Sequence, residues 1–91
     1  MIDRVIVTVL YKENEQVLFQ DDLELSANVP VRELRDGILK ALKKEKRELF
    51  LSVDTIDIAK NDRPDQILDD DVSLASEGIW DGSILVIRRN R

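Results

Sequence analysis

The sequence predicts a single α+β domain, residues 1–91, in which one helix covers a mixed β-sheet of four or five strands. A stretch rich in β-branched residues opens the chain, a second strand with alternating leucines comes next, and a helical pattern of apolar residues follows Pro30. Near the C-terminus, residues 84–87 form an apolar run that is too short for a helix and indicates a buried strand. This last strand needs neighbours, and the candidates lie at the other end of the chain. A chain of this length buries roughly 60–65% of its unfolded surface, enough for one modest core.

The first two strands are predicted at residues 4–11 and 17–25, separated by a polar turn. Asn14 suits this turn because asparagine tolerates the left-handed backbone conformation that hairpin turns require. Asp21 and Asp22 interrupt the apolar pattern of the second strand, so we expect a β-bulge there. The two stretches would form a hairpin at the start of the sheet.

The helix is expected to begin at Pro30, because proline has a helical φ and lacks an N–H that the first turn would leave unpaired. Gly37 costs this helix about 1 kcal/mol relative to alanine, and we expect it to let the helix approach the sheet closely. Residues 49–53 fit either a last helical turn or a strand. Four apolar residues at helical spacing form the stripe that would lie on the sheet: Val31, Leu34, Ile38 and Leu42.

The second half of the chain supplies the remaining strands. A third strand is predicted at residues 55–59, and residues 66–68 are expected to form a short edge strand. A short helical turn closed by Gly78 and a second turn at Gly82 lead into the last strand, since glycine adopts the positive φ that turns often need. The resulting order, ββαββ with the last strand beside the first, is that of a β-grasp fold.

The residue inventory argues against catalysis and against a bound metal or cofactor. The chain contains no cysteine and no histidine, which removes the thiol nucleophile and the commonest general base. The aspartates of residues 62–71 lack the spacing of a calcium-binding loop and are best interpreted as a solvated acidic loop. We therefore expect a protein that is not an enzyme, with no metal, no cofactor and no small-molecule substrate. Without a signal peptide or a membrane-spanning apolar run in the sequence, a cytoplasmic location is expected.

A basic cluster marks the end of the helix and consists of Lys40, Lys43, Lys44, Lys46 and Arg47. Cations are favoured there by the unpaired carbonyls of the helix C-terminus, so a solvated helix face is one interpretation. The alternative is a nucleic-acid-binding or RNA-regulatory β-grasp module that uses the cluster, although the net charge of −5 disfavours nucleic acid. Acidic lipid and an acidic protein are the other partners that suit it. The terminal Arg88, Arg89 and Arg91 could extend the cluster.

Two blocks of sequence carry a resemblance to a known family. The first is Asp-Leu-Glu-Leu at residues 22–25, followed by Val-Pro-Val-Arg-Glu-Leu at residues 29–34. The second joins Ser-Leu at residues 73–74, through Gly-Ile at residues 78–79, to Asp-Gly-Ser-Ile-Leu at residues 81–85. These blocks resemble the Asp-Leu-x-Leu strand, the Pro-Val-x-x-Leu helix start and the Leu-x-x-x-x-Ile-x-Asp-Gly-Asp-x-Leu ending of the YukD/EsaB family. That family consists of small ubiquitin-like proteins linked to bacterial type VII secretion.

The resemblance implies a ubiquitin-like β-grasp and a protein-binding module that is an accessory or regulatory component of a type VII secretion system. The implied partner is a membrane ATPase or channel component, which would recruit the protein from the cytoplasm to the membrane. Covalent conjugation is not expected, because it needs a terminal Gly-Gly pair and this sequence ends in Arg-Asn-Arg.

Three residues are candidates for the docking site. Trp80 lies in a turn, and tryptophan is enriched among interface residues that carry binding energy. By resemblance to ubiquitin, Ile84 and Val86 would face the helix, while Leu85 and Ile87 would lie on the outer face of the sheet. An exposed apolar pair on that face predicts docking to a partner or weak self-association.

Overall fold

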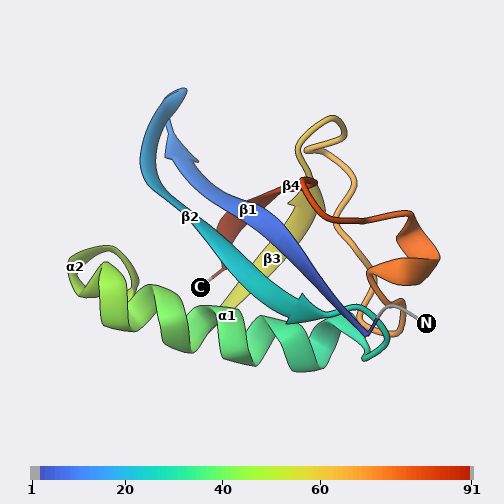
Figure 1. Ribbon diagram of the computed structural model, residues 1–91. Helices are drawn as coiled ribbons and strands as arrows, with labels where there is room; N and C mark the ends of the chain where they lie inside the picture. The colour runs from blue at the N-terminus through green and yellow to red at the C-terminus, as the bar shows by residue number, and fades with distance from the viewer. Residues whose placement is uncertain (1–2, 91) are drawn as a thin grey trace.

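Four strands form one mixed sheet in the computed structural model, which describes residues 3–90 (Figure 1). The strands are β1 (Arg4–Glu13), β2 (Gln16–Ser26), β3 (Thr55–Lys60) and β4 (Ile84–Asn90), and their order across the sheet is β2-β1-β4-β3. The central strands β1 and β4 run parallel, whereas β2 and β3 pair antiparallel with their neighbours. The predicted β-grasp topology, with the last strand beside the first, is confirmed.

The hairpin between β1 and β2 closes through Asn14 and Glu15, which have φ angles of 52° and 67°. Positive φ at both central residues is the pattern of a type I′ turn, whose twist matches that of the flanking strands. The prediction for Asn14 is confirmed. Glu15 also has a positive φ, which its residue type does not predict because glutamate rarely adopts this conformation.

The β-bulge expected at Asp21 and Asp22 is wrong. Both aspartates pair in regular register with β1, and the Asp22 carboxylate accepts a 2.7 Å hydrogen bond from the Thr8 hydroxyl. The register changes instead between Tyr11 and Lys12, which pair with residues 19 and 17, so Leu18 is the extra residue. An acidic pair can stay in a regular strand here because both side chains are exposed to water.

Helix α1 (Val31–Glu45) begins directly after Pro30, whose carbonyl accepts hydrogen bonds from the amides of Glu33 and Leu34. All four residues of the predicted apolar stripe are buried. Gly37 is exposed, and a Cβ added to it would meet no atom within 4 Å. The expectation that Gly37 lets the helix approach the sheet is therefore wrong, because this residue faces away from the sheet.

Residues 49–53 complete the core from a second helical turn rather than from a strand. The short helix α2 (Arg47–Phe50) places Phe50 inside, where its ring meets that of Tyr11 edge-on with 5.0 Å between centroids.

The edge strand expected at residues 66–68 is also wrong. This segment forms only an isolated bridge between Ala59 and Ile67, supported by a hydrogen bond from the Leu68 amide to the Ile58 carbonyl.

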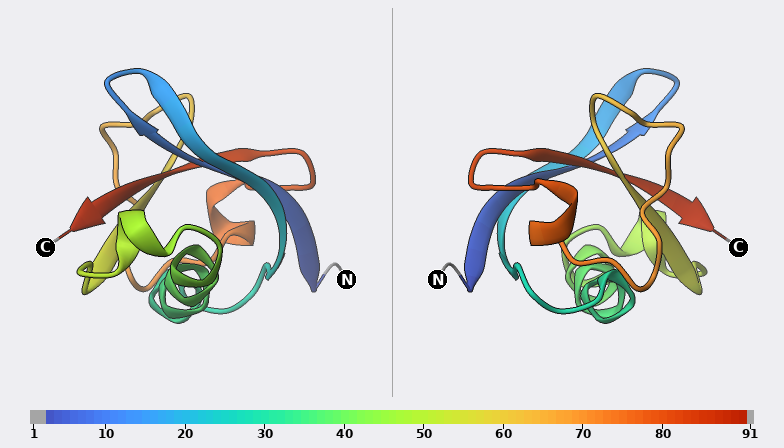
Figure 2. Two further views of the ribbon diagram at one scale, coloured as in Figure 1. Left: turned by 90° about the vertical axis from the view of Figure 1, so that its left-hand side faces the viewer. Right: turned by 90° about the vertical axis from the view of Figure 1, so that its right-hand side faces the viewer.

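The two faces of the sheet have different surroundings. Helix α1 lies across one face, and Figure 2 shows it nearly end-on beneath the twisted strands. The opposite face carries no helix of the described chain. The core lies between α1 and the sheet and is built chiefly from aliphatic side chains, together with Tyr11, Phe19 and Phe50. The uncovered face, called the outer face below, is therefore available for contact with another molecule.

Candidate protein-binding surface

A network of local hydrogen bonds holds the turn that carries Trp80. The short 3-10 helix η1 (Ala75–Glu77) ends at Gly78, which has a φ of 70°. The Trp80 amide donates to the Ser83 hydroxyl at 3.0 Å, and the Ser83 amide donates back to the Trp80 carbonyl at 3.0 Å. The residue itself is 51% exposed. The sequence predicted Trp80 as an anchor, and the structure leaves much of this large side chain in water, as such a role requires.

Strand β1 anchors the same turn at Ile6. The Gly82 amide donates a hydrogen bond to the Ile6 carbonyl at 2.9 Å, and the Asp81 carboxylate accepts a hydrogen bond from the Ile6 amide at 2.7 Å. Gly82 has a φ of 87°, a conformation that glycine adopts without a Cβ clash. The turn is thus joined to the central strand β1, at a residue of the outer face, by both the backbone and a side chain.

The expected placement of Leu85 and Ile87 on the outer face is wrong. Leu85 is 0% and Ile87 1% exposed, and both lie on the inner face toward α1. Their β1 partners Val9 and Tyr11 are also buried in the core. The physical reason is register, because residues paired across neighbouring strands point to the same face. A shift of one residue along a strand moves every side chain to the opposite face. The assignment of β4 residues made by resemblance to ubiquitin is shifted by one residue relative to the structure. Neither buried side chain can serve as a docking residue in this structure.

The outer face instead presents an apolar group that we call the outer-face patch, made up of Ile6, Leu10, Ile84 and Val86. Ile6 is 51% and Ile84 40% exposed, whereas Leu10 is buried and Val86 half-buried. Sequence reasoning missed Ile6 and Ile84. For Ile6, alternation along β1 was the available signal, since Val5, Val7 and Val9 take the inner positions.

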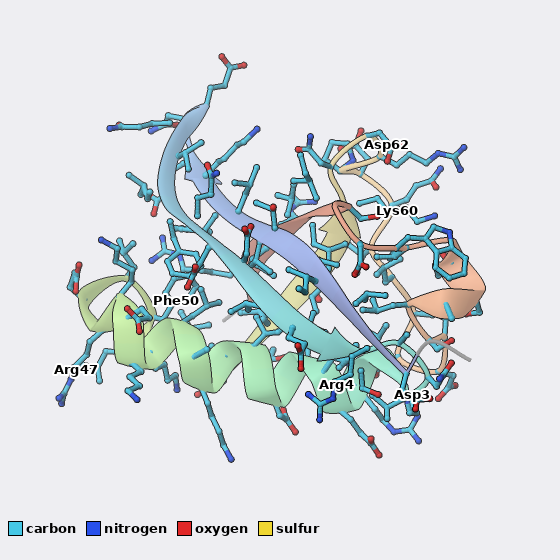
Figure 3. All side chains as sticks on the ribbon, viewed as in Figure 1. Asp3, Arg4, Arg47, Phe50, Lys60 and Asp62 are labelled. Atoms are coloured by element: carbon cyan, nitrogen blue, oxygen red, sulfur yellow. The ribbon has the colours of Figure 1, made fainter. Side chains whose placement is uncertain are left out.

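The basic cluster lies at the end of α1 and the start of α2. Lys40, Lys44 and Arg47 are exposed, while Lys43 and Lys46 are half-buried. None of the five forms an ion pair with a carboxylate among residues 3–90. Figure 3 shows Arg47 pointing away from the body of the molecule, on the side opposite Asp62.

The C-terminal arginines differ from the basic cluster. The Arg89 guanidinium donates to the Leu49 carbonyl at 3.0 Å, lies 3.3 Å from the Glu13 carboxylate and stands over the Tyr11 ring at 5.4 Å. Arg89 therefore ties β4 to α2 and the hairpin rather than adding a free charge. Arg88 is exposed, and Arg91 lies outside the described residues.

The acidic loop before η1 is bound to the start of α1. Asp71 pairs with Arg32 at 2.5 Å, and Arg35 contacts both Asp70 and, at 3.9 Å, Asp57 of β3. The carbonyls of Asp70 and Val72 also accept the amides of Arg32 and Val31, so the loop takes up backbone donors that the first helical turn leaves unpaired. The ion pairs and the backbone hydrogen bonds of the acidic loop therefore stabilise the start of α1. Within residues 3–90, no group of acidic side chains is arranged to hold a metal ion.

These features define the class of protein. A four-stranded mixed sheet, with parallel central strands and one long helix across one face, is the ubiquitin-like β-grasp fold. No described helix is both long and apolar enough to cross a membrane.

Residues 4–87 match the family described as WXG100 protein secretion system (Wss), protein YukD, and the chain belongs to this family. The resemblance predicted from the two sequence blocks is therefore confirmed. The chain is a ubiquitin-like module associated with type VII secretion. No curated protein matches the chain.

Solved structures with similar folds include ubiquitin-like domains of type VII secretion EccD proteins. A chain of the MycP5-free ESX-5 inner membrane complex is 28% identical with a TM-score of 0.75, over 97% of this chain and 21% of that chain. This protein thus spans about a fifth of that chain's length. The ubiquitin-like domain of EccD5 from Mycobacterium xenopi is 20% identical with a TM-score of 0.75, covering 97% of this chain and 96% of that one. The corresponding domain of ECCD1 from Mycobacterium tuberculosis is 23% identical with a TM-score of 0.71, covering 96% and 99%.

Proposed function

We propose that the chain is a protein-binding module that serves as an accessory or regulatory component of a type VII secretion system. Its proposed partner is a membrane component of that system, such as the ATPase or a channel protein, which would hold it at the cytoplasmic side of the membrane. Membership of the YukD family supports the link to secretion. The similar chain from an inner membrane complex supports a membrane component as the partner.

The outer-face patch is the observation that carries this proposal. Ile6 and Ile84 lie on neighbouring strands, and the turn that holds Trp80 is hydrogen-bonded to Ile6 itself. These three residues are 40–51% exposed, although burial would remove apolar area from water at roughly 25 cal/mol per Å². Grouped exposed apolar side chains are typical of interaction sites, and tryptophan is a frequent energetic anchor. A partner that covers both the outer-face patch and the adjoining turn would bury all three.

The proposal concerns binding rather than chemistry. Ubiquitin-like domains of this secretion-associated family are typically non-catalytic. The three glycines lie within α1 and in the two turns before β4, in structural positions rather than in a pair suited to conjugation. We therefore propose a module that acts through its surface without being attached covalently to its partner.

The test measures binding of purified cytoplasmic domains of the secretion ATPase and channel components to the immobilised protein. The variant carries Ile6→Thr, Trp80→Ala and Ile84→Thr, in which threonine keeps a β-branched residue in each strand. We expect at least a tenfold loss of affinity for the true partner, because truncating a central tryptophan alone often costs 2 kcal/mol or more.

A matched control carries Val17→Thr and Ile67→Thr, which replace two exposed apolar residues outside the outer-face patch. This control should bind as the wild type does. Circular dichroism establishes that both variants are folded. A folded outer-face variant that keeps full affinity for the partner would show that the docking surface lies elsewhere.

A further inference from the structure

The charge of this protein is strongly segregated along the chain. Residues 40–48 contain five cations and two glutamates, a formal charge of +3, which leaves −8 on the remaining residues because the total is −5. The cations lie where α1 ends and α2 begins, and Figure 3 places Arg47 on the side of the molecule opposite Asp62 of the acidic loop. Such a molecule approaches an anionic surface with its basic end first, because an uneven charge distribution steers encounter.

Within the described chain, the cations of the basic cluster have no carboxylate partner, unlike four arginines elsewhere in the fold. Arg4, Arg32, Arg35 and Arg89 each form an ion pair within the fold. None of the cluster's cations does so among residues 3–90, although Glu45 and Glu48 are close in sequence. The cluster is therefore not used for internal ion pairing, and its charge is open to an external anion.

An exposed leucine lies beside these cations. Leu51 is 61% exposed, more than any other large apolar residue of the described chain, and its amide bonds to the Arg47 carbonyl at 2.8 Å. Val17 of the hairpin, 44% exposed, lines a surface hollow together with Lys46. Exposed apolar side chains next to lysines and arginines are typical of segments that lie at a membrane surface. The long aliphatic stems of the cations can follow the leucine toward the lipid while their charges stay at the headgroups.

We propose that this basic end, formed by Lys40, Lys44, Arg47 and Leu51, docks on the anionic phospholipid headgroups of a membrane surface. Single-stranded RNA is the less suitable partner, because its binding uses exposed aromatic rings on which bases stack. Tyr11, Phe19 and Phe50 are buried, and the turn that carries Trp80 lies at the other end of the molecule (Figure 1). This surface is separate from the outer-face patch, so the inference goes beyond the proposed function and does not depend on it.

The test is co-sedimentation of the full chain with vesicles of phosphatidylcholine alone and with vesicles in which half of the lipid is phosphatidylglycerol. The wild type is expected to bind only the anionic vesicles, and binding should fall as salt is raised to about 0.5 M. Each juxtamembrane cation contributes roughly fivefold to such an affinity. The triple variant Lys40→Gln, Lys44→Gln, Arg47→Gln should therefore lose at least tenfold, and glutamine keeps the helical propensity. Leu51→Ser should weaken binding and leave the salt dependence unchanged.

The matched control removes the same charge elsewhere, through Arg4→Gln, Arg32→Gln and Arg63→Gln, three exposed positions. It should keep most of the wild-type affinity for anionic vesicles. An equal loss in both triple variants would overturn the proposal in favour of a net-charge effect. The proposal also fails if the folded wild type does not bind anionic vesicles, or if a mixed-sequence single-stranded RNA binds more tightly and displaces it from them.

Discussion

Strand β4 carries two rows of apolar side chains in opposite surroundings. Leu85 and Ile87 are at most 1% exposed beneath the sheet, whereas Ile84 on the outer row is 40% exposed. The side chains are chemically alike, so hydrophobicity does not separate the rows. Helix α1 covers only one face, and the face of each residue is determined by pairing with β1. The inner row therefore contributes to stability, and the outer row is free to contribute to binding.

The same difference continues into the charged end of the strand. Arg89 continues the inner row, and its guanidinium contacts a carbonyl, a carboxylate and an aromatic ring. Arg88 continues the outer row and is exposed. Arginine at the end of a buried row is thus tolerated because its guanidinium is satisfied. Neighbouring residues of one strand can be compared directly, since they share the same backbone and the same neighbours in sequence.

The largest expected effect comes from placing a charge in each row. Leu85→Asp buries an unpaired carboxylate and should lower the free energy of unfolding by more than about 4 kcal/mol, most of what a domain of this size has. Ile84→Asp leaves its carboxylate in water and should change stability by less than about 1 kcal/mol. Urea denaturation followed by circular dichroism measures both. Equal losses in the two variants would contradict the assignment of the rows.

The arginine pair tests whether the difference holds for polar side chains. Arg89→Ala leaves the Leu49 carbonyl and the Glu13 carboxylate without this donor and should cost about 1–2 kcal/mol. Arg88→Ala should stay within about 0.5 kcal/mol, as expected for an exposed position. The two variants have the same net charge, so their thermal unfolding midpoints can be compared at one salt concentration. A larger shift for Arg88→Ala would reverse the proposed roles.

The smallest expected effect concerns the turn that leads into β4. Gly82→Ala forces a φ of 87° on a residue with a Cβ and should cost about 1 kcal/mol, although the added methyl group would meet no atom within 4 Å. Gly37→Ala is the reference, because it lies exposed in α1 and should gain about 0.5–1 kcal/mol. Chemical denaturation gives both values. If Gly82→Ala were neutral, backbone conformation would not be what requires glycine in this turn.

Local patterns predicted most of the fold correctly. The helical spacing from Val31 to Leu42, the turn at Asn14 and the glycine at residue 78 each depend on residues close in sequence, and the structure has all three. The Leu18 bulge and the absence of an edge strand at residues 66–68 depend instead on which residues of two neighbouring segments pair with each other. Period and composition carry no direct information about such pairing.

For the candidate site, Trp80 is predictable from its residue type and its place in a turn, and it is exposed. Ile84 is easily assigned to the wrong face because residues 84–87 are all apolar, so the run shows no polar alternation from which a face could be deduced. The pairing of Val9 with Leu85 resolves this ambiguity. Ile6 could have been found from the inner positions of Val5 and Val7, since those three residues alternate along β1.

The order of residues along the chain was sufficient for the β-grasp topology, the apolar face of α1, the basic cluster and the family, because each is encoded by spacing or by short motifs. Three features could be read only from the tertiary structure. They are the two faces of β4, the ion pairs between the acidic loop and the start of α1, and the contacts of Arg89. The physical reason is that side chains alternate between the two faces of a strand, and this alternation does not show which face the helix covers. Only the position of the helix across one face distinguishes a core residue from a contact residue.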